Sequence, residues 1–312
     1  MSVERRPGGQ GPGGILRGAM SFLPIGKLPG DLLQAVLDKH APRDPRVVVG
    51  PRVGEDAAVI DLGDRYLVAA ADPITFATDE LGWYALHVNA NDVLVRGATP
   101  RWFLATLLLP EGRTNEDTVR ALFAQIGEAC EELEVALVGG HTEITHGLDR
   151  PIVAGTMLGE VARDRLVTTA GAQIGDAIVL TKGVPLEGAA IIAREKDAEL
   201  RARGVPAAMI RRARGFLRTP GISVRPEVEI ACELATVHAM HDPTEGGIAT
   251  ALHELATAAG VVIHALAREA IDCHFIGQVV PAAQGVTLTD GTRQWPLPIF
   301  ARDEITKLFE EA

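Results

Sequence analysis

The sequence predicts a protein of mixed helices and strands, of the α/β or α+β class, with one large or two ordinary domains. Its 312 residues are 47% hydrophobic but only 4% aromatic. Ala, Val, Leu and Gly abound, a composition that suits such enzymes better than repeat arrays, and no internal repeat is visible. A polar, loop-like stretch at residues 163–176 predicts the boundary between two domains.

Charge and cysteine usage argue against several classes of function. A formal net charge of -11 opposes binding to a phosphate backbone, so we expect no nucleic-acid partner. Cys130, Cys232 and Cys273 are isolated, which favours neither a zinc knuckle nor a disulfide framework and predicts a cytoplasmic protein. Residues 1–21 look like a flexible tail without a signal peptide, and no stretch predicts a membrane span.

Periodicity predicts the elements of the first half. Apolar runs beside turn residues predict strands, and apolar residues at helical spacing predict helices. The predicted strands are 57–60, 66–71, 102–109, a short buried strand at 135–138, and 151–160. The predicted helices are 30–40, a helix from Leu81 that stops at Gly97, and 116–133, whose apolar stripe is Leu122, Ile126, Ala129, Cys130 and Leu133.

The second half is predicted in the same way. A strand is expected at 177–181, and helices are expected at 186–196, over most of 197–216, at 227–234 and at 248–259.

An aspartate lies on the core-facing stripe of the helix that begins at Leu81. Asp92 falls between Val88 and Val95 on that stripe, with Asn91 beside it. A buried carboxylate is costly without a partner, which favours a cation or a ligand-lined cleft over this helix. A hydrogen-bonded structural aspartate that caps a loop is the alternative.

Other acidic residues occur where strands and helices begin or end. Asp56 lies in a turn before one strand and Asp72 ends another, so both carboxylates could approach Asp92 and provide the oxygen ligands that Mg²⁺ requires. Asp242, Thr244 and Glu245 lie in HDPTEGG before a helix, a density of polar groups that favours a ligand site. Turn formation and helix capping are the alternatives for these residues.

A glycine pair and a lysine suggest contacts to phosphate. Gly139 and Gly140 follow the predicted strand 135–138 and precede His141 and Thr142, and glycines at such a position let backbone amides approach a bound group. His141 could contact a ligand, bind a metal or be an ordinary loop histidine. Lys182, at the end of the strand 177–181, could meet a phosphate or simply be solvated.

Five stretches in order resemble the aminoimidazole ribonucleotide synthetase, or PurM-like, superfamily. They are GEDAAVI (54–60), the strand end at Asp72, VNANDVLVRGATP (88–100), VGGHTE (138–143) and HDPTEGG (241–247). The resemblance implies an α+β fold with an N-terminal domain at 22–165 that pairs in a homodimer and a C-terminal domain at 166–312. It implies ATP and Mg²⁺ as cofactors. The apolar strands 102–109 and 151–160 would otherwise leave sheet edges open, which favours the same homodimer.

The resemblance also assigns roles to residues. Asp56, Asp72, Asp92 and Asp242 would be magnesium ligands, with Asp92 and Asp242 also catalytic. Gly139, Gly140, Thr142, Thr244 and Glu245 would lie around the nucleotide. Their positions in the sequence add Asn91, His141 and Lys182 as candidates for the same site. His141 stands where several relatives place a carboxylate, so we expect it to face the nucleotide and the site to hold one cation fewer.

The hydrogenase-maturation branch is the most similar part of the superfamily. It implies an ATP- and magnesium-dependent phosphoryl transfer to an oxygen nucleophile on a small molecule or a protein. A non-catalytic nucleotide-binding maturation scaffold and a thiamine-monophosphate kinase-like enzyme remain alternatives, although PITFATDELGW after Asp72 lacks the histidine-containing loop of that kinase. Residues 270–276 lead directly into a terminal strand where relatives have further elements, so a shortened second domain is expected.

Overall fold

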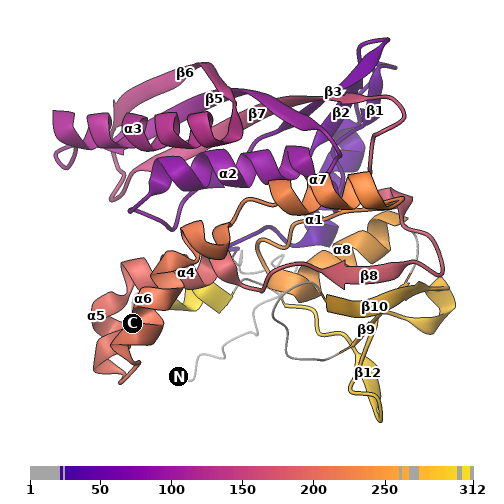
Figure 1. Cartoon of the computed structure of the whole chain (residues 1–312). Helices are drawn as coiled ribbons and strands as arrows, with labels where there is room; N and C mark the ends of the chain where they lie inside the picture. The colour runs from indigo at the N-terminus through magenta and orange to yellow at the C-terminus, as the bar shows by residue number, and fades with distance from the viewer. Residues whose placement is uncertain (1–21, 24, 260–261, 267–273, 301–303, 310–312) are drawn as a thin grey trace, which may run out of the picture.

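Two β-sheets with helices between and beside them form the protein. The computed structural model describes residues 22–23, 25–259, 262–266, 274–300 and 304–309. The sheet of the first half lies above helix α2, and the sheet of the second half lies below helix α7 (Figure 1). This mixed α+β architecture agrees with the fold expected from the resemblance. The predicted tail at 1–21 and most of 270–276 lie outside the described residues.

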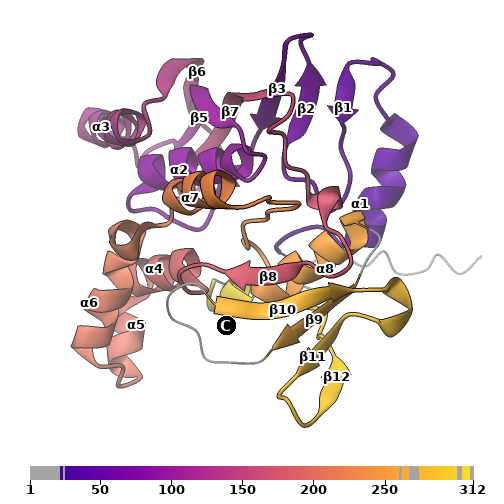
Figure 2. The ribbon, with the colours of Figure 1, turned by 45° about the vertical axis from the view of Figure 1, so that its right-hand side comes forward.

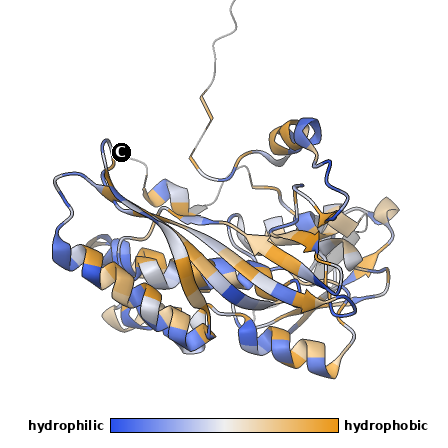
Figure 3. Ribbon diagram, turned by 90° about the horizontal axis from the view of Figure 1, so that it is seen from above, coloured by the Kyte–Doolittle hydropathy of each residue, from blue (hydrophilic) through white to orange (hydrophobic). Residues whose placement is uncertain are grey.

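The first sheet has the order β1-β2-β3-β7-β5-β6, with β4 paired to β7. Its strands are β1 (Val47–Val49), β2 (Ala58–Asp61), β3 (Arg65–Ala70), β4 (Pro73–Ile74), β5 (Thr99–Pro110), β6 (Ala136–Thr145) and β7 (Ile152–Ala162). Only the β5–β6 pair is parallel. Buried and partly exposed residues alternate along β5 and β7 because one face of the sheet covers the core. Figure 3 shows hydrophobic residues, in orange, on helices and strands alike.

The edges of this sheet differ from the prediction. The strands 102–109 and 151–160 were expected to leave edges open, but β5 and β7 are both interior strands, so that expectation is wrong. The edge strands are β1 and β6. The strand expected at 135–138 is neither short nor buried, because β6 has ten residues and most of them are exposed. Gly139 and Gly140 therefore lie inside an edge strand and not in a turn.

Helices α2 (Leu81–Leu94) and α3 (Glu116–Leu133) cover the inner face of this sheet. Every residue of α2 is buried, so the helix has no solvent face and the expected single apolar stripe is replaced by contacts all round. Two glycines of β7 permit the close approach. A Cβ atom on Gly155 would lie 2.4 Å from the Asn89 amide nitrogen, and one on Gly159 would lie 2.4 Å from Val93.

The second half contains a five-stranded sheet in the order β12-β11-β9-β10-β8. Its strands are β8 (Ala177–Leu180), β9 (Val262–Leu266), β10 (His274–Val280), β11 (Thr287–Thr289) and β12 (Gln294–Pro296). The helices after α3 are α4 (Leu186–Glu195), α5 (Asp197–Ala202), α6 (Ala207–Gly215), α7 (Arg225–Leu234) and α8 (Gly247–Ala259), and α1 (Gly30–Leu37) precedes the first sheet. In Figure 2, α1 and α8 lie close together beside the strands of both sheets.

The helix and strand bounds follow the predictions closely in most places, and α3 matches both in range and in its buried residues. Among the residues that the structure describes, no helix is long and apolar enough to cross a membrane.

Candidate functional site

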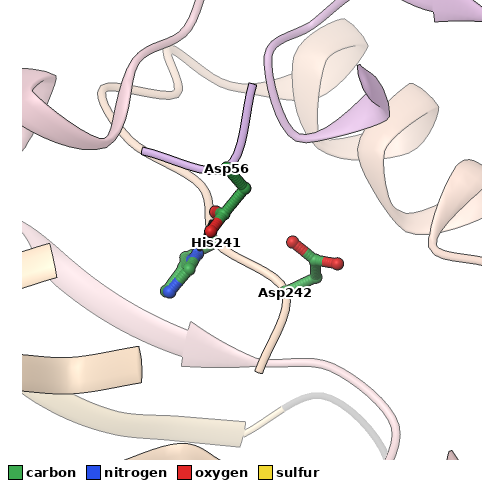
Figure 4. A group of neighbouring side chains, drawn as sticks. All are labelled: Asp56, His241 and Asp242. Atoms are coloured by element: carbon green, nitrogen blue, oxygen red, sulfur yellow. Dashed lines mark ion pairs between the residues drawn. The ribbon is translucent and has the colours of Figure 1, made fainter. Parts of the chain in front are cut away.

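The four predicted metal-ligand aspartates come from four separate elements and meet between the two halves of the chain. Asp56 precedes β2, Asp72 follows β3, Asp92 lies in the last turn of α2, and Asp242 precedes α8. Ligand atoms of Asp56, His241 and Asp242 all lie within 4.8 Å of one another (Figure 4). Asp92 lies close enough to Asp72 for the charge of Asp72 to raise its pKa. We call Asp56, Asp72, Asp92 and Asp242 the acidic cluster.

Asn89 of α2 fixes the backbone at Asp72. The Asp72 amide donates to Asn89 Oδ1 at 2.8 Å, and Asn89 Nδ2 donates to the Asp72 carbonyl at 3.1 Å. The same Nδ2 donates to the Ala85 carbonyl one turn earlier, at 2.7 Å. Because α2 packs closely against the glycines of β7, these two hydrogen bonds fix the position of Asp72 relative to Asp92 on the same helix.

Burial and mutual repulsion raise the pKa of three of the four carboxylates in the acidic cluster, those of Asp72, Asp92 and Asp242. Burial, followed by the charges of Glu245 and Asp56, raises the pKa of Asp72 to about 6. Burial raises the pKa of Asp242 to about 7, with the charge of Asp56 acting in the same direction. The pKa of Asp92 is raised well above its ordinary range by burial and by the charges of Asp242, Asp72 and Asp56.

Three oxygens of the acidic cluster lack a hydrogen-bond donor. Within the described part of the chain, Asp92 Oδ2 and both carboxylate oxygens of Asp242 are buried without a partner. Unpaired buried carboxylate oxygens are costly, and a divalent cation with oxygen ligands would satisfy them. The residues present therefore fit a hard cation such as Mg²⁺.

A chain of ion pairs runs through the site and contains residues that the sequence reasoning missed. His241 contacts Asp56 through Nδ1 at 2.8 Å and Glu254 of α8 through Nε2 at 2.9 Å. Lys27, from the segment before α1, contacts the other Glu254 oxygen at 3.0 Å. These two carboxylates raise the pKa of His241 to about 10 although burial opposes protonation, so the imidazole is a cation. Of the three residues to which the sequence analysis gave no role, His241, Glu254 and Lys27, only His241 lies in a quoted motif, as the first residue of HDPTEGG.

Arg96, just after α2, extends the same network. Its guanidinium is fully buried and lies 3.1 Å from Glu55 and 3.4 Å from Asp56. It also donates to the Thr169 hydroxyl at 2.6 Å, in the stretch that joins the two halves. The sequence signal for Arg96 was a charged residue directly before the helix-stopping Gly97. An arginine is seldom fully buried unless it is paired, so its burial here depends on Glu55 and Asp56.

Two residues predicted to lie around the nucleotide bond to a loop of the second half. The Asn91 amide donates to the Ile222 carbonyl at 2.9 Å and accepts from the Val224 amide at 3.0 Å. The Lys182 ammonium donates to the Ser223 carbonyl at 2.5 Å and lies 3.1 Å from Glu227. Both side chains therefore hydrogen-bond to the backbone of residues 222–224, the segment before α7.

The remaining predicted residues lie in two places. Gly139, Gly140, His141 and Thr142 are on the exposed edge strand β6, where the His141 side chain is 65% exposed and contacts Glu143 at 3.2 Å. Thr244 and Glu245 follow Asp242 after Pro243. The charge of Glu245 raises the pKa of both Asp72 and Lys27, which places this carboxylate beside the acidic cluster. The structure thus brings the aspartates and Glu245 together and leaves the β6 residues on a separate surface.

The structure defines a two-domain α+β protein with one acidic site between its domains. Comparison with known proteins gives its family. The family model described as AIR synthase related protein, N-terminal domain, matches residues 54–161. The model described as the C-terminal domain of the same family matches residues 173–272. The chain therefore belongs to the AIR synthase-related, PurM-like family.

Individual relatives include enzymes with different names. The chain is 31% identical to selenide, water dikinase of Paraburkholderia xenovorans over 278 residues, which are 86% of this chain and 73% of the relative. It is 30% identical to carbamoyl dehydratase HypE of Cupriavidus necator over 222 residues, 67% of this chain, so the match spans 58% of that relative's length. A crystal structure of the hydrogenase maturation protein HypE in complex with ATP has the same fold. Its TM-score is 0.63 at 22% identity, and the match covers 84% of this chain and 92% of that one.

Proposed function

We propose that this protein is an ATP- and Mg²⁺-dependent phosphoryl-transfer enzyme that activates or phosphorylates an oxygen nucleophile on a small molecule or a protein. The observation that carries the proposal is the acidic cluster, in which buried carboxylates from both domains leave oxygens of Asp92 and Asp242 without donors. The relatives named as a water dikinase and as HypE support ATP as the second ligand.

The residues divide the work by their charge. Asp56, Asp72, Asp92 and Asp242 would hold magnesium, which supplies charge neutralisation for the phosphates when bound. Arg96 and His241 keep Asp56 ionised, since the charges of both lower its pKa. Lys27, held by Glu254, is the nearby cation that faces the same acidic groups. Burial of the cluster excludes water and strengthens each of these interactions.

Titration calorimetry with a non-hydrolysable ATP analogue tests the proposal. We expect binding in the presence of MgCl₂ and its loss with a chelator. The variant Asp92→Asn should lower the affinity for the analogue more than tenfold, by our rough estimate from removing one ligand charge, while the protein stays folded. Asp149→Asn, at an exposed surface pair with Arg150, is the matched control. Binding that is indifferent to both the chelator and Asp92→Asn would contradict the proposal.

A homodimer built on the edge strand β6 is part of the proposal. Leu137, Val138 and Ile144 are exposed there by 41%, 54% and 57%, and an exposed apolar edge strand favours pairing with a second copy. In such a dimer the predicted nucleotide residues of β6, including His141, would lie at the interface. Light scattering of the wild type and of Val138→Lys tests this, with a dimer expected for the first and a monomer for the second.

A non-catalytic nucleotide-binding scaffold is the alternative function, and measuring ATP hydrolysis distinguishes it from an enzyme. We expect the purified protein to release ADP slowly alone and faster with its acceptor. Thiamine monophosphate is the first acceptor to try, because a thiamine-monophosphate kinase is among the relatives. Selenide, named for another relative, tests whether the nucleophile is selenium instead of oxygen.

A further inference from the structure

We propose that Asp56, His241 and Asp242 form a mixed nitrogen and oxygen site that prefers a first-row transition-metal dication over Mg²⁺, with His241 Nδ1 as a ligand. This inference deepens the proposed function, since it concerns the identity of the cation in the same acidic cluster. It rests on how His241 is placed between two carboxylates.

The separation between His241 and Asp56 fits two ligands of one ion. Their atoms Nδ1 and Oδ2 are 2.8 Å apart. Adjacent ligands of an octahedral ion with bonds of about 2.1 Å lie roughly 3.0 Å apart, so little movement is needed. Figure 4 shows the Asp56 carboxylate next to the His241 ring, with the Asp242 carboxylate to the right of both. One ligand atom from each residue lies within 4.8 Å of the other two.

The other side of the imidazole is held as the imidazole of a metal-bound histidine is usually held. His241 Nε2 lies 2.9 Å from Glu254, whose second oxygen contacts Lys27 at 3.0 Å. A carboxylate that accepts the proton of the distal nitrogen fixes the ring and directs the other nitrogen to the metal. The metal would replace the proton on Nδ1, which makes the imidazole a cation when no metal is bound.

A second observation points to a ligand independently of this arrangement. Asp242 is 6% exposed, and within the described part of the chain neither of its oxygens has a donor. Asp92, which is 3% exposed, has one such oxygen, and its pKa is raised by the charge of Asp242, so unpaired buried oxygens occur on two neighbouring carboxylates.

The ligand chemistry sets the preference. Oxygen ligands alone suit Mg²⁺, whereas one imidazole among carboxylates adds affinity for ions such as Mn²⁺, Fe²⁺ and Zn²⁺. We use Mn²⁺ as the probe, because it accepts the same carboxylates and its unpaired spins report on nitrogen ligands.

The first experiment needs no variant. Calorimetric competition should give an affinity for Mn²⁺ about tenfold or more above that for Mg²⁺. The electron spin echo of bound Mn²⁺ should be modulated by one ¹⁴N nucleus.

Variants assign the nitrogen. His241→Asn leaves an oxygen near the position of Nδ1, so it should abolish the ¹⁴N modulation and remove the preference for Mn²⁺ over Mg²⁺. Glu254→Gln should keep the modulation and lower the affinity for Mn²⁺ by about 10- to 100-fold. The matched control is His238→Asn, which breaks a histidine–carboxylate contact of 2.9 Å with Asp176 outside the site. It should change neither the modulation nor the preference.

The outcomes separate this inference from the proposed function. Magnesium-dependent nucleotide binding without ¹⁴N modulation in the wild type, or equal affinities for the two ions, overturns the mixed site and leaves the proposed function standing. Loss of modulation in His238→Asn also overturns the assignment to His241. Failure of every dication to bind contradicts both.

Discussion

Replacing Asp242 with asparagine is expected to stabilise the protein in the absence of metal. The pKa of Asp242 is raised from 3.8 to about 7, and its carboxylate oxygens have no donor in the described structure. The folded state therefore keeps a proton that the unfolded state loses from about pH 4 upward. Stability is highest below the unfolded pKa and falls as the pH rises toward the folded pKa.

The size of the effect follows from these two values. Each pH unit between them corresponds to about 1.4 kcal/mol, so the whole difference corresponds to roughly 4 kcal/mol, of which about 3 kcal/mol falls between pH 5 and pH 7. Asp→Asn removes this titration. Because the carboxylates of the cluster influence one another, we expect a gain of a few kcal/mol at pH 8, or roughly 5 °C or more in melting temperature.

Thermal unfolding at pH 5 and pH 8, with and without MgCl₂, measures the effect. The wild type should lose stability from pH 5 to pH 8 and regain it with Mg²⁺, which compensates the ionised carboxylates. Asp242→Asn should be more stable than the wild type at pH 8 without metal, and should gain little from Mg²⁺. A metal-free variant that melts below the wild type at pH 8, while Asp149→Asn does not, would refute the argument that repulsion and burial dominate at this carboxylate.

Two further predictions concern packing. Arg96→Met should cost about 1–3 kcal/mol in chemical denaturation, because it removes the buried cation that Glu55 and Asp56 share. Glu55 keeps Arg52 at 2.6 Å and Asp56 keeps His241 at 2.8 Å, so no measurable loss would show that these remaining pairs suffice. Gly159→Ala should cost about 1–3 kcal/mol, since its Cβ would lie 2.4 Å from Val93 and 2.7 Å from the Thr99 carbonyl. The control Gly127→Ala, in open space on α3, should instead be neutral or slightly stabilising, so equal losses in the two variants would contradict the close approach of β7 and α2.

Local patterns in the sequence were sufficient for most of the helices and strands. The bounds of α3 and its five buried residues follow from apolar spacing alone, since one face of that helix packs on the core and the other meets water. Gly97 ends the α2 region with a φ of 71°, a backbone conformation that glycine adopts without strain. The order of the motifs was enough to indicate the family, and the family models match the same regions.

Tertiary structure decided which of the polar residues meet. The sequence placed Asp56, Asp72, Asp92 and Asp242 on separate elements, and only the packing of α2 under β7 and of the second domain on the first brings them to one point. Asn91 looked like a ligand contact from its position beside Asp92, yet both ends of its amide bond to the backbone at Ile222 and Val224.

The ion pairs and the sheet edge were beyond local patterns for the same physical reason. Lys27 and Glu254 are 227 residues apart in the chain, so their contact depends on how the domains close and not on any spacing. Likewise, the alternation within a strand shows which side chains share a face but not how many strands lie beside it. For this reason the sequence could predict β5 and β7 but not that both are interior, and it could not show that β6, with its glycine pair, is the edge.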